Sequence, residues 1–327
     1  VPMAAQAAPE LYGIVDIGLE SFSADGNQAG QFDIFQGFNQ AGNSFDNTDD
    51  KDFTLTNGLQ SRLGVRGSED LGNGLTASYR MEFSVDVLDE GGGSANSGTG
   101  LGTRLGWVAL GGDWGQVKVG SQWQDTFAYS AWNVHHTDVH GYGTYFYTTG
   151  LMPGSLAYGF RQDSTISYQY GGGGYSTDPF TFSVQANIGE DRGAVVNEDG
   201  LSALSAYAAG SFGPVTINGG VVQSFFDDGV SGNQDLEPSM INVGGRWRIS
   251  EMFSLGVNYT EVDRDTSNNE TREAFNVAGF ANWGNGWDAH LGFGTGEDDR
   301  DEDTFNGRDI SSDVYGFVRK ALSSRTD

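Results

Sequence analysis

Alternating apolar and polar side chains, connections that are short and long in turn, and the lack of any long apolar run predict an all-β protein, a transmembrane antiparallel up-and-down β-barrel. A helix that spans a bilayer needs about 20 consecutive apolar residues, and no stretch of the 327-residue chain supplies them. A barrel strand needs only one apolar face, because its other face looks into an aqueous lumen. A polar chain with 51 glycines and 13% aromatic residues is compatible with such a barrel.

The alternation has a period of two along almost the whole chain. Between residues 75 and 87 every second side chain is apolar or aromatic, and those between are Thr, Ser, Arg, Glu or Asp. Residues 180–188 and 241–249 show the same division. Since a strand turns successive side chains to opposite faces, each segment has one apolar and one polar face. A slip of one residue in 241–249 would turn Arg246 and Arg248 toward lipid, at about 2–4 kcal/mol each near the midplane, so the register is strongly specified.

This pattern predicts about fourteen strands joined in sequence order. They are expected at 11–20, 58–67, 75–87, 103–111, 116–122, 164–170, 180–188, 201–212, 214–226, 241–249, 253–262, 273–283, 287–294 and 310–322. Short turns such as Gly284–Gly286 alternate with long loops such as 123–163, as in outer-membrane barrels. Aromatic residues near the strand ends are expected to form a girdle at the membrane interface: Tyr12, Trp107, Tyr168, Trp247, Tyr259, Trp283 and Trp287.

Composition removes several classes of function. The chain has no cysteine, which excludes disulfide frameworks, thiolate metal sites and cysteine nucleophiles. A net charge of −27 argues against a nucleic-acid partner and is compatible with an acidic extracellular surface. Residues 1–7 end in the small-x-small pattern of a signal-peptidase site, so we expect a signal-peptide remnant there and the barrel in 8–327. A flexible alanine-rich N-terminus is the alternative.

Several motifs along the whole chain resemble one family. Residues 61–75 read SRLGVRGSEDLGNGL, and further stretches of this kind are Leu11–Asp16, 103–110 with 115–120, Arg161 with 164–168, and Ala321–Asp327. They are similar to strands of Gram-negative general porins and, for 321–327, to the turn after their strand 14. The resemblance implies a homotrimeric barrel in the bacterial outer membrane. It also implies passive diffusion of small hydrophilic solutes and ions, with no enzymatic activity and no cofactor.

The chain departs from this family at its C-terminal end. Such porins have sixteen strands and usually finish on an aromatic residue, whereas this sequence stops at Asp327, where strand 15 should begin. We therefore expect about fourteen strands, with the last hairpin of the barrel missing. The N-terminal strand should then lack its usual partner, and such a chain should fold poorly alone because unpaired backbone groups are costly in lipid.

The resemblance further implies that loop 123–160 folds into the barrel and narrows it opposite a cluster of arginines. Arg62, Arg104 and Arg161 fall on the matching positions, and strand parity independently turns Arg62 and Arg104 toward the lumen. The same parity applies to two further basic residues. The predicted constriction residues are Arg62, Arg80, Arg104, Arg161 and Lys118, with Asp125 and Asp138 of the loop as counter-charges. The alternative for each arginine is that it only balances a nearby carboxylate.

Two polar clusters invite a metal hypothesis. His135, His136 and His140 lie around Asp138, but zinc needs ligands that converge on one point, so loop histidines beside an aqueous constriction are favoured. The acidic run 297–303 lacks the alternating ligands and central glycine of an EF-hand, which favours a hydrated loop over a calcium site. Such a loop could still contact lipopolysaccharide through divalent cations.

Two other functions remain open at this stage. A barrel enzyme would need an activated nucleophile, and His290 beside Asp288 is the nearest candidate, without a G-x-S-x-G or comparable signature. A substrate-specific channel for oligosaccharides could use the aromatic residues of the long loop, which are Trp132, Tyr142, Tyr145, Phe146 and Tyr147. For ions we expect weak selectivity that leans toward cations, because acidic loops at the outer mouth oppose the arginines of the constriction.

Overall fold

The computed structural model describes residues 9–22, 51–57, 61–85, 87–88, 101–132, 161–172, 178–188, 200–225, 237–263, 271–298 and 313–322. In these residues fourteen antiparallel strands form one sheet in sequence order, and two further strands, β2 and β3, pair with each other separately. The strands of the large sheet are β1 (Glu10–Ile14), β4 (Arg62–Gly72), β5 (Leu75–Val85), β6 (Leu101–Gly112), β7 (Gly115–Trp123), β8 (Arg161–Tyr170), β9 (Phe180–Ile188), β10 (Leu201–Phe212), β11 (Val215–Ser224), β12 (Ser239–Arg248), β13 (Phe253–Asp263), β14 (Thr271–Gly284), β15 (Trp287–Asp298) and β16 (Asp313–Lys320). The small sheet consists of β2 (Ile17–Phe22) and β3 (Lys51–Asn57).

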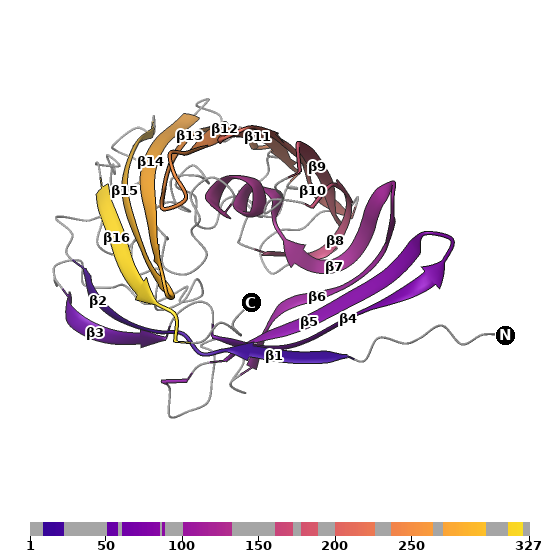
Figure 1. The fold of residues 1–327 in the computed structure, drawn as a ribbon. Helices are drawn as coiled ribbons and strands as arrows, with labels where there is room; N and C mark the ends of the chain where they lie inside the picture. The colour runs from indigo at the N-terminus through magenta and orange to yellow at the C-terminus, as the bar shows by residue number, and fades with distance from the viewer. Residues whose placement is uncertain are drawn as a thin grey trace.

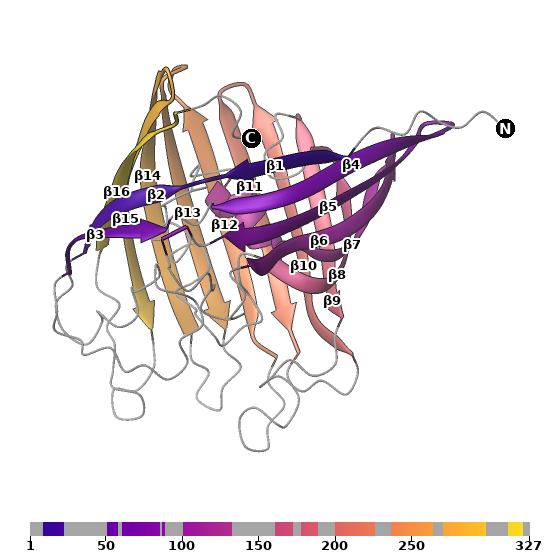
Figure 2. The same ribbon diagram turned by 90° about the horizontal axis from the view of Figure 1, so that it is seen from below.

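The large sheet curves around a short π-helix, η2 (Phe127–Trp132), which lies on its concave side (Figure 1). Seen from below, β4–β6 run at a marked angle to β11–β14, as the twist of a sheet of many strands requires (Figure 2). In the described part of the chain the sheet runs from β1 to β16 without pairing between these two ends. The predicted all-β, antiparallel, up-and-down architecture is confirmed.

The predicted division into an apolar and a polar face is also present. On β12, Ile241, Val243 and Trp247 are half-exposed, whereas Asn242 between them is fully buried. The outward row is therefore the one that meets hydrocarbon in a membrane, and the inward row is polar. None of the helical segments among the described residues has the length and hydropathy to cross a membrane.

Two-residue turns fix the register of several hairpins. Asn73 and Gly74 link β4 to β5 with φ values of 53° and 77°, and Asn285 and Gly286 link β14 to β15 with 52° and 77°. Two consecutive residues with positive φ are typical of type I′ turns, whose twist matches that of the flanking strands. Asn and Gly are the residues that adopt this conformation most readily. Both turns lie within the short connections expected from the sequence.

Expectations for the N-terminal region were partly wrong. A single strand was expected at 11–20 and a loop at 21–57, but the chain forms β1, then β2, and returns as β3. The interruption lies at Asp16, where the Ser61 hydroxyl replaces strand pairing: it donates to the Asp16 carbonyl and accepts from the Asp16 amide, at 2.9 Å each. The alternation in β3 covers only Phe53 and Leu55, too short a signal to separate it from the surrounding loop.

Candidate functional site

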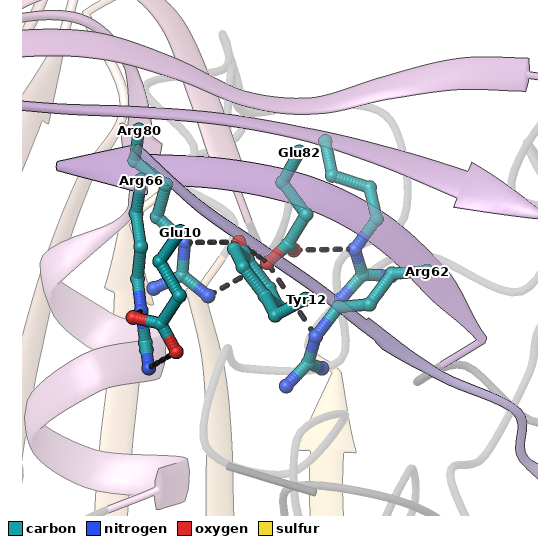
Figure 3. Close-up of polar contacts among 7 residues, drawn as sticks. Glu10, Tyr12, Arg62, Arg66, Arg80 and Glu82 are labelled. Atoms are coloured by element: carbon teal, nitrogen blue, oxygen red, sulfur yellow. Dashed lines mark hydrogen bonds and ion pairs between the residues drawn. The ribbon is translucent and has the colours of Figure 1, made fainter. Parts of the chain in front are cut away.

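A buried carboxylate gathers basic side chains on the inner wall of the sheet. Glu82 on β5 has 0% of its side chain exposed and contacts three guanidinium groups. Its oxygens lie 2.7 Å from Arg104 Nε, 2.7 Å from Arg80 Nη2 and 3.4 Å from Arg62 Nε. Tyr12 donates its hydroxyl to Glu82 Oε2 at 2.7 Å. These five residues, the arginine cluster, come from β1, β4, β5 and β6. Figure 3 labels four of them, Tyr12, Arg62, Arg80 and Glu82.

The arginine cluster holds more positive than negative charge. One carboxylate cannot neutralise three guanidinium groups, which remain protonated in proteins. The three arginines differ in burial: the exposed fraction of the side chain is 5% for Arg104, 12% for Arg62 and 23% for Arg80. Charge-assisted hydrogen bonds offset part of the cost of desolvating them. The excess positive charge therefore faces the lumen, mainly through Arg80.

Tyr12 lies at the centre of this arrangement. Its hydroxyl accepts a hydrogen bond from Arg80 Nε at 2.7 Å while donating to Glu82. The Cζ atoms of Arg66 and Arg80 lie 5.1 and 5.2 Å from the centroid of its ring, within the range of cation–π attraction. Arg66 also pairs with Glu10 at the exposed end of β1, with 2.8 Å between Nε and Oε2 (Figure 3).

The expectation that Tyr12 and Trp107 belong to the interfacial girdle was wrong, because both face the lumen. The Trp107 ring lies under Lys118, whose Nζ is 4.8 Å from its centroid, while Val108 next to it is exposed on the outer face. A bulge explains the change of parity on β6: Glu82 pairs with Leu105 but Phe83 pairs with Thr103, so the strand carries one extra residue.

Trp123 connects the arginine cluster to the next basic residue. It ends β7, and its ring lies 5.9 Å from Arg104 Cζ and 5.3 Å from Arg161 Cζ. Arg161 begins β8 and pairs with Trp123 in the sheet. The basic residues predicted from sequence thus form a continuous inner surface, with Lys118 on the neighbouring strand β7.

After β7 the chain continues along the inner face of the sheet and packs against β9 and β10. Asp125 is buried, and its Oδ2 accepts a hydrogen bond from Ser205 of β10 at 2.9 Å. Its amide donates to Gln185 of β9 at 3.2 Å. Burial raises the pKa of Asp125 to about 7, although hydrogen bonds from Ser183 and Ser205 and the charge of Lys118 act in the opposite direction.

The next five residues attach to the same wall through neutral groups. The hydroxyls of Thr126 and Tyr207 lie 2.9 Å apart, and those of Tyr129 and Thr181 3.2 Å apart. Ser130 donates to Asn242 and accepts from Asn218. The Tyr129 ring is buried in an apolar patch on the inner wall, whose members are Ala203, Tyr207, Ala209, Val222, Met240 and Val262. Residues 124–130, the inner segment, are thus fixed to β9–β12.

The predicted constriction residues fall into three groups. Arg62, Arg80 and Arg104 meet around Glu82, and Arg161 and Lys118 extend the same surface. Asp125 packs against the next strands of the sheet, β9 and β10, where Ser205 donates to it and Lys118 is the basic residue that acts on it. Asp138, the loop histidines and Tyr142–Tyr147 lie outside the described residues, as does the side chain of Trp132.

Sequence reasoning missed Glu82 and Tyr12 as members of the site. Glu82 was visible as an acid two residues from Arg80, on the same face of one strand. Its contacts with Arg62 and Arg104 depend on cross-strand register, which the sequence does not reveal. The histidine considered for catalysis is engaged otherwise: His290 stacks on Phe317 at 5.4 Å, and Asp288 receives the guanidinium of Arg319 at 2.8 Å.

Comparison with known proteins agrees with this geometry. The model of the Gram-negative porin family matches residues 1–327, and no curated protein sequence matches the chain. Salmonella typhi OmpF in complex with daunomycin is a similar structure, with a TM-score of 0.66 and 12% identity over 96% of this chain and 86% of that one. The outer membrane channel DcaP of Acinetobacter baumannii gives 0.59 and 15%, over 91% and 80%. The anion-selective porin from Comamonas acidovorans gives 0.50 and 17%, over 97% and 96%.

At these identities the similar structures show the fold alone, and the family match covers the whole chain. Family membership favours a channel over an enzyme. The chain belongs to the Gram-negative porin family and is a channel protein of the bacterial outer membrane.

Proposed function

We propose that this protein is a general diffusion channel for small hydrophilic solutes and ions, without enzymatic activity, and that it acts as a homotrimer. The observation that carries the proposal is the pairing of two unlike inner surfaces. The arginine cluster with Arg161 and Lys118 lies on β1 and β4–β8, and the inner segment lies on the lumen side of β9–β12. Solutes crossing the barrel would pass between them.

The charge on the first surface supports a filter for ions. Screening lengths of about 8 Å at physiological salt are comparable to the radius of a pore, so charges at the narrowest point act strongly on a passing ion. The acidic loops of a chain with net charge −27 attract cations to the mouth, whereas the arginines favour anions inside. The two effects oppose each other, and we propose weak selectivity that leans toward cations.

The described aromatic residues of the loop support a general channel over one specific for oligosaccharides. Phe127 and Tyr129 are both buried, and Tyr129 is used to attach the inner segment to the wall. Buried rings are not available to stack on a passing sugar. Saturable block of ion current by a panel of oligosaccharides would instead favour the specific channel.

Planar-bilayer recordings of the double variant Arg62→Gln/Arg104→Gln test the site. Removing two positive charges should raise cation selectivity, seen as a shift of the reversal potential in a salt gradient. The matched control is Arg248→Gln/Lys320→Gln, which removes the same charge from exposed last residues of β12 and β16. If the two variants shift the reversal potential equally, or neither does, the arginine cluster does not control ion flow.

Two companion measurements complete the test. Arg104→Lys keeps the charge and should keep the wild-type reversal potential, which separates loss of charge from misfolding. Native electrophoresis and light scattering in detergent test the homotrimer: a mass of one chain of 34.9 kDa at all concentrations would contradict it.

A further inference from the structure

One member of the arginine cluster, Tyr12, is uncharged and contacts charged residues of both signs. The Tyr12 hydroxyl lies between Arg80 Nε and Glu82 Oε2, 2.7 Å from each, and it accepts from the first while donating to the second. Its ring is flanked by the guanidinium groups of Arg66 and Arg80. Arg80 therefore has three contacts in the cluster. Its Nε donates to the Tyr12 hydroxyl, its Nη2 donates to Glu82, and its guanidinium plane lies near the Tyr12 ring.

Gly64 provides the space in which the Tyr12 ring lies. The two residues are directly opposite each other in the β1–β4 pair. A Cβ atom at position 64 would lie 2.5 Å from Tyr12 Cζ, closer than non-bonded atoms can approach. Any side chain there would therefore displace the ring and its hydroxyl from the arginine cluster.

The same strand carries a matched arrangement on its other face. Tyr79 on β5 lies directly opposite Gly67, and a Cβ atom at position 67 would lie 2.7 Å from the Tyr79 hydroxyl oxygen. Since Arg66 and Arg80 next to this pair face the lumen, Gly67 and Tyr79 face outward. Each face of β4 thus carries a tyrosine ring over a glycine, and the ring on the inner face reaches the arginine cluster.

We infer that Tyr12 is a positioning residue that fixes Arg80 against the wall and thereby sets the ion selectivity of the pore, an inference that rests on the proposed function. Arg80 is the most exposed arginine around Glu82, so its position decides how far the positive charge reaches into the lumen. Without the hydroxyl, Nε would lose its acceptor and turn to water, which moves the guanidinium toward the pore axis. The total charge would not change.

Reversal-potential measurements on Tyr12→Phe and Gly64→Ala test this inference. Both variants keep every charge, and both should raise the anion-to-cation permeability ratio by about 1.5- to 2-fold, the size expected when one charge in water-like surroundings moves by a few ångström. Gly67→Ala and Tyr79→Phe make the same chemical changes on the outer face and should keep the wild-type ratio.

A double-mutant cycle separates positioning from a general structural effect. Lysine has no Nε donor equivalent to that of arginine, so Tyr12→Phe should have no further effect on the ratio in an Arg80→Lys background. An equal shift in both backgrounds would overturn the inference, as would wild-type ratios for both Tyr12→Phe and Gly64→Ala. If these ratios stay unchanged while Arg62→Gln/Arg104→Gln still shifts the reversal potential, the role of Tyr12 is wrong and the proposed function stands.

Discussion

The two inner surfaces of the barrel hold their side chains in place by different means. Around Glu82, the contacts are ion pairs and charge-assisted hydrogen bonds between β1, β4, β5 and β6. On the opposite side of the curved sheet, η2 and the residues before it are held by hydroxyl and amide groups of β9–β12 (Figure 1). We call the first surface, around Glu82, the charged wall because it carries net positive charge. The second, β9–β12, is the neutral wall because it anchors the inner segment mainly through uncharged groups.

The two kinds of contact differ in how strongly each depends on a single partner. Ion pairs are sensitive to each partner, because a charge left alone in a buried place is costly. Neutral hydrogen bonds contribute less each, about 0.5–1.5 kcal/mol, but several in a row fix a segment as firmly. Asp125 is the exception on the neutral wall, since it is an acid among serines.

Glu82→Gln should break the charged wall and have the largest effect. It leaves three guanidinium groups around an uncharged amide, which should lower the free energy of unfolding by about 3–5 kcal/mol. It should also make the pore strongly anion-selective. Urea unfolding followed by tryptophan fluorescence, together with reversal potentials, measures both. Glu10→Gln removes an exposed carboxylate from Arg66 and should change neither quantity much; wild-type stability for Glu82→Gln would show that the arginines do not depend on it.

Asp125→Asn should remove the one carboxyl group of the inner segment, and with it a pH dependence of the free energy of unfolding. Burial raises the pKa of Asp125 to about 7 from 3.8, so the folded protein holds this proton more tightly than the unfolded chain. Its stability should therefore be unaffected by this group below about pH 4, fall as the pH rises from 4 to 7, and stay reduced above 7. With about 1.4 kcal/mol for each pH unit, the loss is a few kcal/mol.

The measurement for Asp125→Asn is the urea midpoint between pH 4 and pH 8. The variant should match the wild type near pH 4 and exceed it at pH 8. Parallel curves for the two proteins across this range would mean that Asp125 ionises as an exposed acid does. The reversal potential at pH 8 should change little, because the Asp125 side chain is buried between the inner segment and β9–β10.

Ser130→Ala should weaken the neutral wall without touching the charged one. It removes the donor to Asn242 and the acceptor for Asn218, both buried, at a cost of about 1–3 kcal/mol. We expect lower stability and more current noise from the inner segment, with an unchanged reversal potential. Ser254→Ala, on β13 and only partly buried, is the control. A shifted reversal potential in Ser130→Ala would mean that the two walls do not act separately.

Alternation in the sequence was enough to predict most of the fold. It located thirteen of the fourteen strands of the large sheet to within about five residues, because a strand that separates lipid from lumen must alternate along its length. It did not predict β3, where only Phe53 and Leu55 alternate, nor the interruption at Asp16, which depends on a side chain 45 residues away.

The sequence was enough to predict which basic residues lie on the inner face, but not which residues they contact. The basic residues were found from parity and family resemblance, whereas Glu82 and Tyr12 require knowledge of which residues face each other across strands. Parity also fails where a strand carries a bulge, as β6 does between Thr103 and Leu105. A periodic pattern read through that point assigns Trp107 to the wrong face.

The position of the inner segment has a consequence for the order in which the molecule is assembled. Ser130 follows β7 directly in sequence, yet its partner Asn242 lies 112 residues later. Ser130 also accepts from Asn218, and Thr126 and Tyr129 of the same segment contact Tyr207 and Thr181, all on strands that follow β7 in the sequence. Contacts between residues so distant in the chain are slow to form, because a long loop must close first. The contacts of the inner segment with β9 and β10 close shorter loops than those with β11 and β12, so we expect the segment to complete its attachment only when β12 has joined the sheet.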